Sequence, residues 1–372
     1  GGTSFDVSLI NNGMVSLASQ TAIDFGMVVR TPMIEVTTIG AGGGSIASID
    51  ASGLLQVGPE SAGSDPGPVC YGLGNTKPTV TDATLVLGLI NHKRPIGGKL
   101  HKLDIDKAKT AIKDHISDYL RLSIEDGAEA ILRVANAKMA GAIRLVSIEK
   151  GHDPNKFSAM PFGGGGALHT GALIKEVGLK SAIVPRFPGV TSALGCVVSD
   201  LLYDRVQTVN KLLKDVDFKD LKRQILISSS ELENYVIGSA TDVLSLERFY
   251  EFDILYIGQT HTVVVPFELE GQTLNETLLQ NAFNRAYLDS YGRLLEDIPI
   301  KIINYRVIVA GRRPSFDMSL FAPKTGKSAS ECVLQERKIY SNGKFWQVNV
   351  YDRLSLAIKE RIPGPALLEQ SD

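Results

Sequence analysis

Two glycine-rich loops are the parts of this sequence whose residue types best fit phosphate chemistry. Residues 1–4 are Gly-Gly-Thr-Ser and precede a β-branched run, which places backbone N–H groups and hydroxyls where a phosphate can sit. Residues 163–166 are four glycines before a predicted helix, beside the positive end of that helix's dipole. Each loop also has a simpler interpretation, a hairpin turn for the first and a packing turn in a parallel α/β unit for the second.

Two further loops have compositions that suggest close backbone approaches. Residues 38–45 are Thr-Ile-Gly-Ala-Gly-Gly-Gly-Ser and follow a strand-like run, where they are suited to contact a substrate or a neighbouring lobe. Residues 58–72 combine proline and glycine in a rigid irregular loop, which reduces foldability unless something binds there. The sequence leaves the target of both loops open.

Acidic and histidine side chains near these loops are candidates for acid–base or metal chemistry. Asp82 stands at the start of an apolar helical run, where it is either the N-cap of that helix or a carboxylate that polarises water or holds a metal. The 6 histidines lack metal-ligand spacing, so no zinc site is expected and the metal ligands stay unassigned. His169 either contacts a nucleotide or is hydrogen-bonded to backbone, and His261 is expected to be structural.

The elements that must position these residues follow from the hydrophobic pattern. Three β-branched runs, at residues 5–10, 33–39 and 181–184, predict strands in the first half of the chain. Ser123-Ile-Glu-Asp126 has the spacing of a capping box, and apolar residues then recur at helical intervals until Gly151. This half of the chain therefore predicts an α/β domain with one long helix against a sheet.

The composition changes after about Arg205, where the glycine-rich loops stop. The following segment predicts a compact α+β unit, with helices and strands in the order 217–236, 247–256, 260–266, 275–291 and 298–310. Asn342-Gly343 lies between two strand-like runs and predicts a hairpin in a small β-rich tail. We therefore expect three domains, at residues 1–205, 206–322 and 323–372.

Charge and hydropathy narrow the classes of function. The 39 Lys and Arg residues against 41 Asp and Glu give a net charge of −2, and no basic run forms a patch for a phosphate backbone. Nucleic acid and anionic membrane are therefore not expected as partners. No apolar stretch approaches the ~20 residues that span a bilayer, and the 3 scattered cysteines fit free thiols in a reducing compartment. These features predict a cytoplasmic globular protein.

Taken in order, the motifs of this chain resemble those of the hydantoinase A and 5-oxoprolinase family. That family includes N-methylhydantoinases and is related to beta-type subunits of acetone carboxylases. The resemblance covers most of the chain. Its motifs are Gly-Gly-Thr-Ser-x-Asp at residues 1–6, Thr-Ile-Gly-Ala-Gly-Gly-Gly-Ser at 38–45, Gly-Pro-Glu-Ser-Ala-Gly at 58–63, Thr-Val-Thr-Asp-Ala at 79–83, Val-Ala-Asn-x-x-Met at 134–139, Phe-Gly-Gly-Gly-Gly-Ala-Leu-His at 162–169, Pro-Gly-Val-x-Ser-Ala-Leu-Gly at 188–195, Tyr-Ile-Gly-Gln-x-His at 256–261 and Tyr-Asp-Arg at 351–353.

The resemblance implies a fold and a chemistry. The implied fold is the second lobe of an actin-like, ribonuclease H-like ATPase, followed by an α+β domain and a β-rich tail. Family members use ATP, here expected with Mg²⁺ or Mn²⁺, to phosphorylate an amide oxygen or bicarbonate. Phosphorylation makes a resonance-stabilised lactam reactive, so the protein has chiefly to position phosphates and offset charge.

The resemblance also implies roles for particular residues. The first loop is the expected phosphate loop and the second the expected adenosine loop, so the predicted nucleotide contacts are Gly1, Gly2, Thr3, Gly163, Gly164, Gly165 and Gly166. We expect Asp82 to be the main catalytic carboxylate and Asp6 to orient the loop or a metal's waters. Many relatives carry a histidine where this chain has Thr37, so no metal or proton-transfer role is carried over there.

The start of the chain, Gly1-Gly2-Thr3 without an initiator Met, suggests that the family's N-terminal lobe is missing. We therefore expect this chain alone to bind nucleotide weakly and to be inactive. For the complete enzyme we expect ATP-dependent hydrolysis of a hydantoin, 5-oxoproline or a related lactam through phosphorylation of the amide oxygen, with a hydantoinase B-type partner subunit in an oligomer. A carboxylase subunit of the acetone carboxylase type and a non-catalytic assembly subunit remain alternatives.

Overall fold

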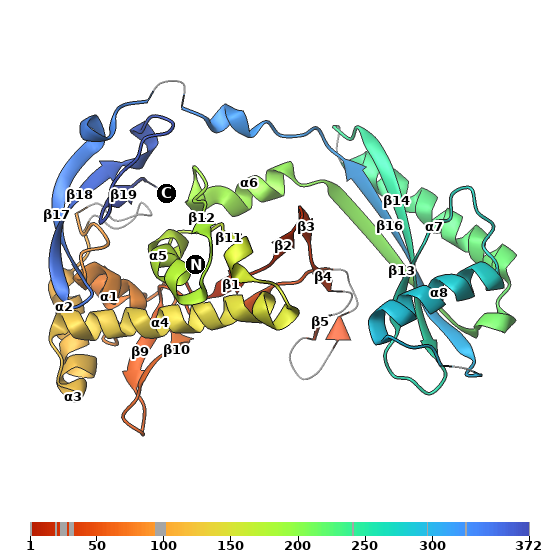
Figure 1. Cartoon of the computed structure of the whole chain (residues 1–372), viewed down its shortest axis with the longest axis horizontal. Coiled ribbons are helices and arrows are strands. Elements are labelled where there is room, and N and C mark those ends of the chain that lie inside the picture. The colour runs from red at the N-terminus through yellow and green to blue at the C-terminus, as the bar shows by residue number, and fades with distance from the viewer. Residues whose placement is uncertain are drawn as a thin grey trace. The chain divides into compact units, whose positions relative to one another are not determined.

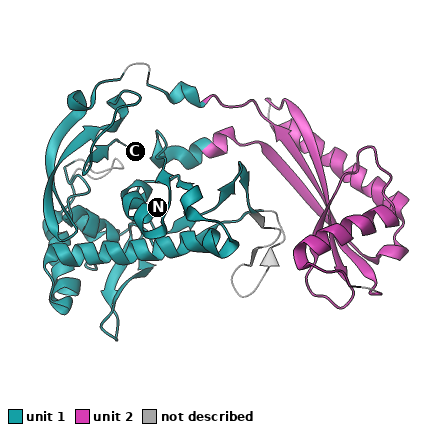
Figure 2. Cartoon of the chain, viewed as in Figure 1, with its two compact units in different colours: residues 1–194, 318–372 teal, residues 195–317 magenta. Residues whose placement is uncertain are grey.

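The computed structural model describes most of the chain in stretches separated by short gaps. These stretches are residues 2–18, 21–22, 28–29, 33–93, 102–239, 242–295, 297–323 and 326–371. The chain forms two compact units, the first of residues 1–194 and 318–372 and the second of residues 195–317 (Figure 2). Across these stretches, no helix has both the length and the apolar character needed to cross a membrane.

The first unit is organised around α4 (Ile124–Val146), the long helix predicted from its capping box (Figure 1). The Ser123 hydroxyl accepts a hydrogen bond from the backbone N–H of Asp126 at 3.0 Å, which satisfies one of the unpaired donors at the helix start. One face of α4 is buried, with Ile131 and Ala135 fully inaccessible to solvent. This helix is therefore the common support for the elements on either side of it.

The first half of the unit contains short antiparallel strand pairs. β1 (Phe5–Val7) pairs with β8 (Thr37–Ile39), and β9 (Ser45–Ile49) pairs with β10 (Leu55–Ser61). Smaller pairs join β2 (Ile10–Asn11) to β3 (Met14–Val15), β4 (Leu17–Ala18) to β7 (Met33–Ile34) and β5 (Thr21–Ala22) to β6 (Val28–Val29). The predicted strands at residues 5–10 and 33–39 are thus broken into shorter pieces.

Three shorter helices pack with α4 around one apolar core. They are α1 (Val80–Val86), α2 (Ile105–Ile112) and α3 (Asp118–Leu120), with a π-helical turn from Lys113 to Ser117 that joins the last two. The large side chains of this core that are at most 1% exposed include one from each of five elements, and these are Val57, Leu85, Ile112, Ile116 and Ile131. Burial of these side chains stabilises the helical layer beside β9 and β10.

A βαβ unit follows α4 in the chain. β11 (Ser158–Ala159) and β12 (Ser181–Ala182) pair in parallel, and α5 (Gly166–Val177) connects them. The helix α6 (Thr191–Val198) then leads towards the second unit. The parallel pair with its intervening helix confirms the α/β character predicted for this part of the chain.

The tail forms a sheet that packs within the first unit. β17 (Val333–Ser341) and β18 (Lys344–Asp352) make the predicted hairpin, whose turn places Asn342 and Gly343 at φ 55° and 72°. β19 (Leu367–Glu369) adds a parallel third strand. Tyr340 of β17 donates its backbone N–H to Leu87 O at 2.9 Å and its hydroxyl to Asp126 Oδ1 at 2.5 Å. We expected residues 323–372 to be a separate domain, and these contacts with α1 and α4 show that they are not.

The second unit is an α+β domain, as its predicted order of elements indicated. Its sheet has the antiparallel order β13-β16-β14-β15, formed by β13 (Leu201–Leu212), β16 (Ile300–Arg312), β14 (Ser245–Tyr256) and β15 (Val263–Phe267). Two helices, α7 (Phe218–Ser239) and α8 (Glu276–Tyr291), bury their apolar faces against it, and Phe252, Phe283 and Tyr305 are almost fully buried there. The expected boundary at residue 205 is wrong because it cuts through β13.

Candidate functional site

The first glycine-rich loop lies directly on the third. The backbone N–H of Gly44 donates to Gly2 O at 2.6 Å. A Cβ added at Gly42 would lie 2.8 Å from the carbonyl carbon of Thr3, and one added at Gly44 would lie 3.1 Å from Gly2 O. The sequence left the target of residues 38–45 open, and the structure identifies it as the loop at residues 2–4.

Residues 42–44, which contact the loop at residues 2–4, are also hydrogen-bonded to the start of α1. Thr81 donates both its backbone N–H and its hydroxyl to Gly43 O, at 2.8 and 2.9 Å. Gly42 donates its N–H to the fully buried Ser45 hydroxyl at 2.8 Å. Because these bonds fix the conformation of residues 42–44, the loop at residues 2–4 packs against a rigid support.

The loop at residues 2–4 is open to solvent where it does not contact residues 42–44. Gly2, Thr3 and Asp6 are exposed, and a Cβ added at Gly2 would meet nothing within 4 Å. The Thr3 hydroxyl has no hydrogen-bond partner among the described residues. Gly1, the remaining predicted member of this loop, lies outside the described residues. An anion can therefore approach the described backbone and hydroxyl groups without displacing another part of the protein.

Asp6 holds the shape of the loop through two hydroxyl groups. Its Oδ1 accepts from Thr38 Oγ1 at 2.7 Å, and its Oδ2 accepts from Ser4 Oγ at 3.1 Å. Since Thr38 belongs to β8, the carboxylate ties the residues after the phosphate-type turn to the neighbouring strand. This geometry fits the expected role of orienting the loop.

Asp82 is fully buried and is not the N-cap. The N-cap of α1 is Thr79, and Asp82 is the third helical residue of a capping box. Its carboxylate accepts from Thr79 N at 2.9 Å, Thr79 Oγ1 at 2.8 Å, Val69 N at 3.1 Å and Cys70 N at 2.8 Å. With 0% of the residue exposed and four donors in place, this geometry favours a role in holding the loop at residues 66–72 over one in polarising water.

The Cys70 thiol next to this carboxylate is buried. Burial raises the pKa of Cys70 far above its usual value, and the charge of Asp82 raises it further. The thiol is therefore protonated at neutral pH and is not a nucleophile.

The four-glycine loop joins β11 to α5, as the sequence predicted. Gly163 has φ 82°, which glycine adopts without strain, and its N–H donates to Pro188 O at 2.7 Å. No side chain caps α5 at Gly165, so the N–H groups of its first turn are not satisfied by a capping side chain. A Cβ added at Gly164 would meet nothing within 4 Å. The loop therefore presents open backbone at the positive end of a helix dipole.

His169, in the first turn of α5, bonds to a side chain that the sequence did not suggest. Its Nδ1 lies 2.7 Å from Asn136 Oδ1 on α4, and the residue is only 6% exposed. Burial lowers the pKa of His169 to about 4, so the ring is neutral at physiological pH. Because the amide oxygen can only accept, we assign the donor proton to Nδ1. The sequence left a nucleotide contact and a backbone hydrogen bond open for His169, and the structure shows a side-chain contact that links α5 to α4.

Both loops are supported by the same helix. Met139 and Ile143 of α4 belong to a buried cluster with Leu173 and Val177 of α5. Phe5 of β1 packs against the same cluster. The elements that carry residues 2–4 and 163–166 are thus brought onto one scaffold within the first unit, which is the arrangement that a shared ligand would require.

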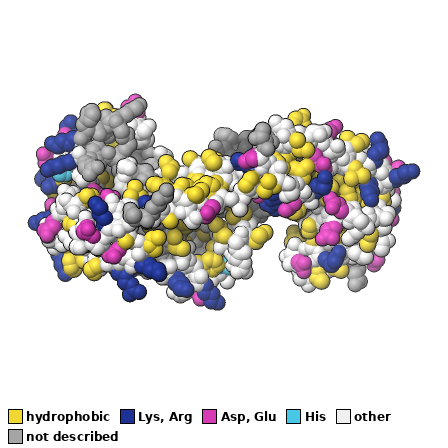
Figure 3. Space-filling model, turned by 90° about the horizontal axis from the view of Figure 1, so that it is seen from above, with side chains coloured by type: hydrophobic (Ala, Val, Ile, Leu, Met, Phe, Trp, Pro, Cys, Tyr) yellow, Lys and Arg dark blue, Asp and Glu magenta, His cyan; other side chains and the backbone are white. Residues whose placement is uncertain are grey.

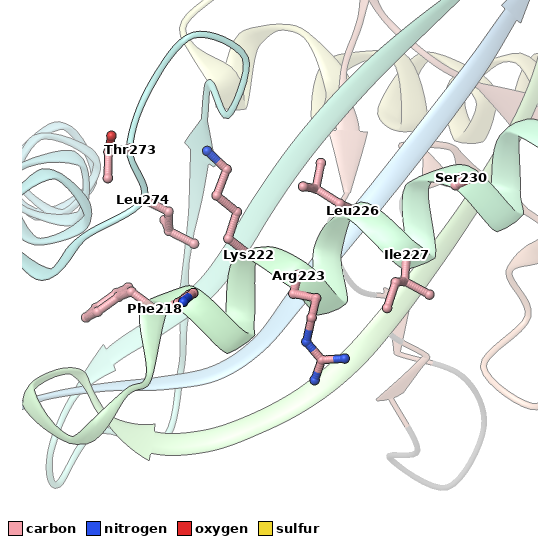
Figure 4. A pocket seen from close by; sticks show the side chains of 9 residues that line it. Phe218, Lys222, Arg223, Leu226, Ile227, Ser230, Thr273 and Leu274 are labelled. Atoms are coloured by element: carbon pink, nitrogen blue, oxygen red, sulfur yellow. The ribbon is translucent and has the colours of Figure 1, made fainter.

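The second unit contains a groove of a different character. It has a volume of about 620 Å³ and runs beside α7, lined by Phe218, Leu226, Ile227, Leu274 and neighbouring residues (Figure 4). Its lining has no carboxylate and no nucleophile paired with a base, so it does not favour catalysis. On the face of the molecule drawn in Figure 3, Lys and Arg side chains are dispersed among acidic and apolar ones. We therefore place the candidate site at the glycine loops of the first unit.

Motif residues of the second unit are held by local contacts. Gln259 donates its Nε2 to the Tyr287 hydroxyl at 2.6 Å, which fixes a turn after β14 against α8. His261 is exposed, and its Nδ1 lies 2.9 Å from the hydroxyl of the adjacent Thr260. Gln259 therefore has a structural contact, whereas the structural role expected of His261 stays a prediction.

Comparison with known proteins agrees with the family that the order of the motifs indicates. The sequence profile described as Hydantoinase/oxoprolinase matches residues 1–205. The chain is 33% identical over 380 residues to the caprolactamase subunit alpha of Pseudomonas jessenii, a match that covers 100% of this chain and 54% of that subunit. It is 27% identical over 384 residues to the acetone carboxylase beta subunit of Xanthobacter autotrophicus, covering 99% of this chain and 53% of the relative. It is 28% identical over 387 residues to the 5-oxoprolinase of Saccharomyces cerevisiae, covering 99% of this chain and 29% of that protein.

Two solved structures share the fold. A nucleotide-free structure of acetone carboxylase matches with a TM-score of 0.78 and 26% identity, covering 99% of this chain and 54% of the other. The ATP-dependent caprolactamase of Pseudomonas jessenii matches with a TM-score of 0.73 and 30% identity, covering 100% of this chain and 54% of the other. The chain therefore spans about half the length of the caprolactamase and acetone carboxylase subunits that it matches. With the profile match over residues 1–205 and the motif order described above, it belongs to the hydantoinase/oxoprolinase family.

Proposed function

We propose that this chain carries the phosphate- and nucleotide-binding part of an ATP-dependent hydrolase of cyclic amides. The observation that carries the proposal is the exposed loop at residues 2–4, which rests on residues 42–44. An ATP-dependent caprolactamase and 5-oxoprolinases among the relatives support a lactam as the substrate class. In this proposal the first unit is the second lobe of an actin-like ATPase.

The proposed roles follow from exposure and hydrogen bonding. Gly2 and Thr3, together with Gly1, bind phosphate oxygens through backbone N–H groups and the Thr3 hydroxyl. Residues 163–166 take the adenosine side of ATP, because the open space at Gly164 allows a flat ring to approach the backbone closely. Asp6 orients the phosphate loop, and Asp82 is a positioning residue that fixes the neighbouring loop at residues 66–72.

The proposed reaction has two steps. In the first, the amide oxygen of the lactam attacks the γ-phosphorus of ATP, the new O–P bond forms, and ADP leaves as the old bond breaks. The phosphorylated amide has lost much of its resonance, so water adds to its carbon. The C–N bond then opens as the nitrogen takes a proton, and inorganic phosphate leaves. The residues described here contribute by positioning the phosphates and excluding stray water.

A divalent ion fits this scheme without a preformed cluster of ligands. The described residues include no group of three or more His, Cys, Asp or Glu side chains that could hold a metal. Mg²⁺ usually keeps several waters and binds through one or two carboxylates plus substrate phosphates. Asp6, an exposed residue of β1 just after the loop at residues 2–4, is the carboxylate that fits that role for Mg²⁺ or Mn²⁺. The bound ion would offset the charge of the phosphates.

A second function, ATP-dependent carboxylation, is favoured by a specific observation. The acetone carboxylase structure matches this chain with a TM-score of 0.78. A carboxylase would use the same phosphate site to activate bicarbonate instead of a lactam. A third possibility is a subunit that keeps the fold for assembly without turnover.

The relatives also bear on assembly. They include a caprolactamase alpha subunit, an acetophenone carboxylase gamma subunit and an acetone carboxylase beta subunit. We therefore propose that this protein acts in the cytoplasm as part of an oligomer with a hydantoinase B-type partner. Co-purification of a tagged full-length chain with its partner, followed by measurement of the mass of the complex, tests this proposal.

The activity is tested with the complete enzyme and its partner subunit. Phosphate release is measured with ATP and a panel of lactams that includes hydantoin, 5-oxoproline and caprolactam, and separately with ATP, bicarbonate and a ketone. We expect release that depends on a lactam. Release only with bicarbonate and a ketone would instead establish the carboxylase, and release with neither would favour the assembly subunit.

The 372-residue chain alone provides a second measurement. We expect calorimetry with ATP and Mg²⁺ to detect weak binding, with a dissociation constant well above about 1 μM, and no turnover. The physical reason is that one phosphate loop supplies only part of the donors that an ATP site in an actin-like fold requires. Sub-micromolar binding by this chain would contradict the proposal that a further lobe contributes to the site.

A further inference from the structure

The Tyr-Asp-Arg turn at residues 351–353 makes an unusual set of backbone contacts. Arg353 follows β18, and its Nη1 donates to Arg186 O at 2.9 Å. Its Nη2 donates to Val184 O at 2.8 Å and to Pro185 O at 2.7 Å. One guanidinium group of the tail thus binds three consecutive carbonyl oxygens in the segment that follows β12.

Neighbouring side chains reinforce this contact from both sides. Gln370 accepts a hydrogen bond from Arg353 Nη1 and donates its own Nε2 to Arg186 O at 3.1 Å. Arg186 donates in return to Leu354 O at 3.1 Å. Asp352 shapes the turn itself, because its carboxylate accepts from Leu354 N at 3.2 Å and from Ser355 Oγ at 2.6 Å. Residues 184–186 are therefore held by the tail in one conformation.

The segment held in this way continues directly into the four-glycine loop. Pro188, two residues after Arg186, is buried, and its carbonyl oxygen accepts the Gly163 N–H at 2.7 Å. Between them, Phe187 packs edge-on against Phe321, which lies just before the tail, with ring centroids 5.5 Å apart. A short path of hydrogen bonds and packed side chains therefore runs from Arg353 to the first glycine of the loop.

We propose that Arg353 is a positioning residue for nucleotide binding by residues 163–166. The inference rests on the proposed function, because it assigns a ligand to that loop. It goes beyond that function in making the tail, which does not itself contribute to the loop, a determinant of ATP affinity. The tail fixes residues 184–188, and these residues fix the position of Gly163.

Arginine is required for this contact because of the shape of its donor group. The planar guanidinium carries five N–H donors in a fixed fork and can bind several carbonyl oxygens at once. Lysine at the same position keeps the charge and the aliphatic stem but presents a compact ammonium group. Arg353→Lys therefore removes the multiple contact while disturbing the packing of the tail less than Arg353→Ala.

Arg337→Ala is a matched control in the same sheet. Arg337 of β17 donates to Glu369 Oε1 at 2.6 Å, so its loss weakens the tail sheet. Within the described part of the chain, its hydrogen-bonded and ionic partner is Glu369, and it makes no such bond to residues 184–188. The control therefore separates general weakening of the tail from loss of the path to Gly163.

The experiment compares wild type, Arg353→Lys, Arg353→Ala and Arg337→Ala in the complete enzyme. We expect both Arg353 variants to raise the KM for ATP and the dissociation constant of a fluorescent ATP analogue about tenfold. The kcat and the KM for the lactam are expected to change by less than about twofold, because the contact acts on ATP binding. Hydrogen exchange at residues 160–168 is expected to become faster in Arg353→Lys and to stay unchanged in Arg337→Ala.

The outcomes distinguish this inference from the proposed function. If the wild-type enzyme binds no ATP analogue, both are refuted. If it binds the analogue but Arg353→Lys has unchanged ATP affinity and unchanged hydrogen exchange, the inference alone is refuted. An equal loss of ATP affinity in Arg337→Ala would also refute it, since the effect would then reflect general stability of the tail. Should Arg353→Ala fail to fold, Arg353→Lys and Gln370→Ala supply the same comparison.

Discussion

Replacing Gly42 with alanine tests whether the contact between residues 2–4 and 42–44 governs phosphate binding. The new Cβ would lie 2.8 Å from the Thr3 carbonyl carbon and 2.9 Å from both the carbonyl carbon and the oxygen of Gly2. Ordinary contact begins near 3.4 Å, so the phosphate-type loop must move by about 0.6 Å. All three atoms belong to the backbone, and no flexible side chain can absorb the shift.

The size of the effect follows from this displacement. Forcing an extra methyl group into a filled space costs roughly 1–3 kcal/mol of stability. A misplacement approaching 1 Å lowers a reaction rate by as much as about 100-fold when geometry controls it. We therefore expect kcat/KM for ATP to fall about 10- to 100-fold, measured by phosphate release from the complete enzyme, with a lower thermal midpoint.

Gly141→Ala provides the control. Gly141 lies within α4, and a Cβ there would meet nothing within 4 Å. Alanine favours a helix over glycine by about 1 kcal/mol, so this variant should be at least as stable as wild type and equally active. If Gly42→Ala released phosphate at the wild-type rate with an unchanged KM for ATP, the contact would have no part in positioning the phosphates.

Three further substitutions test other groups of the first unit. Asp82→Asn places an amide among four donors and should lower the free energy of unfolding by about 2–4 kcal/mol in urea titrations; an unchanged midpoint would contradict the bonding described for this carboxylate. The pKa of His169 is about 4 in the fold and 6.5 ordinarily, so the unfolded chain binds more protons between these values and stability falls as pH drops through that range. His169→Gln should remove about 2 kcal/mol of this loss of stability between about pH 7.5 and about pH 5, as measured by urea unfolding at both pH values. An identical pH dependence in wild type and His169→Gln would contradict the prediction. Gly343→Ala puts a side chain at φ 72° in the hairpin and should cost about 1 kcal/mol by thermal unfolding, whereas an unshifted midpoint would show that the turn relaxes freely.

Local signals in the sequence predicted several elements correctly. The capping box at Ser123 located the start of α4, and Asn342-Gly343 located the tail hairpin. The four glycines between an apolar run and a helical run predicted the turn from β11 to α5. Each of these features depends on residues within a few positions of one another, which is the range that turn chemistry and periodicity describe.

Contacts between distant residues were not predictable in the same way. The Thr79-x-x-Asp82 spacing is itself a local capping-box signal, whereas the bonds from Val69 and Cys70 to Asp82 run through a loop whose path the sequence does not show. The pairing of His169 with Asn136 depends on how two helices pack. For these residues the type of side chain was informative, but the partner was set by tertiary packing.

The domain boundaries show a related difficulty. The end of the glycine-rich composition at Arg205 falls within β13, because a change in loop content need not coincide with the end of a strand. The tail appeared separate in sequence because its hairpin pattern is self-contained. Its contacts with Leu87 and Asp126 depend on how the hairpin packs against α1 and α4, and the hairpin pattern does not predict that packing.

The course of the chain through its two units has a consequence for how the protein is made. Residues 195–317 interrupt the first unit in sequence, and the first and last strands of this insertion are neighbours, with Leu201 opposite Gly311. Antiparallel partners lie only about 5 Å apart, so the insertion leaves and returns at nearly one point. On the ribosome, the inserted domain is therefore fully synthesised before the hairpin that completes the first unit has emerged. The earlier segments of that unit therefore lack the hairpin, and the surface that receives Tyr340 stays uncovered, while the inserted domain is synthesised and can fold.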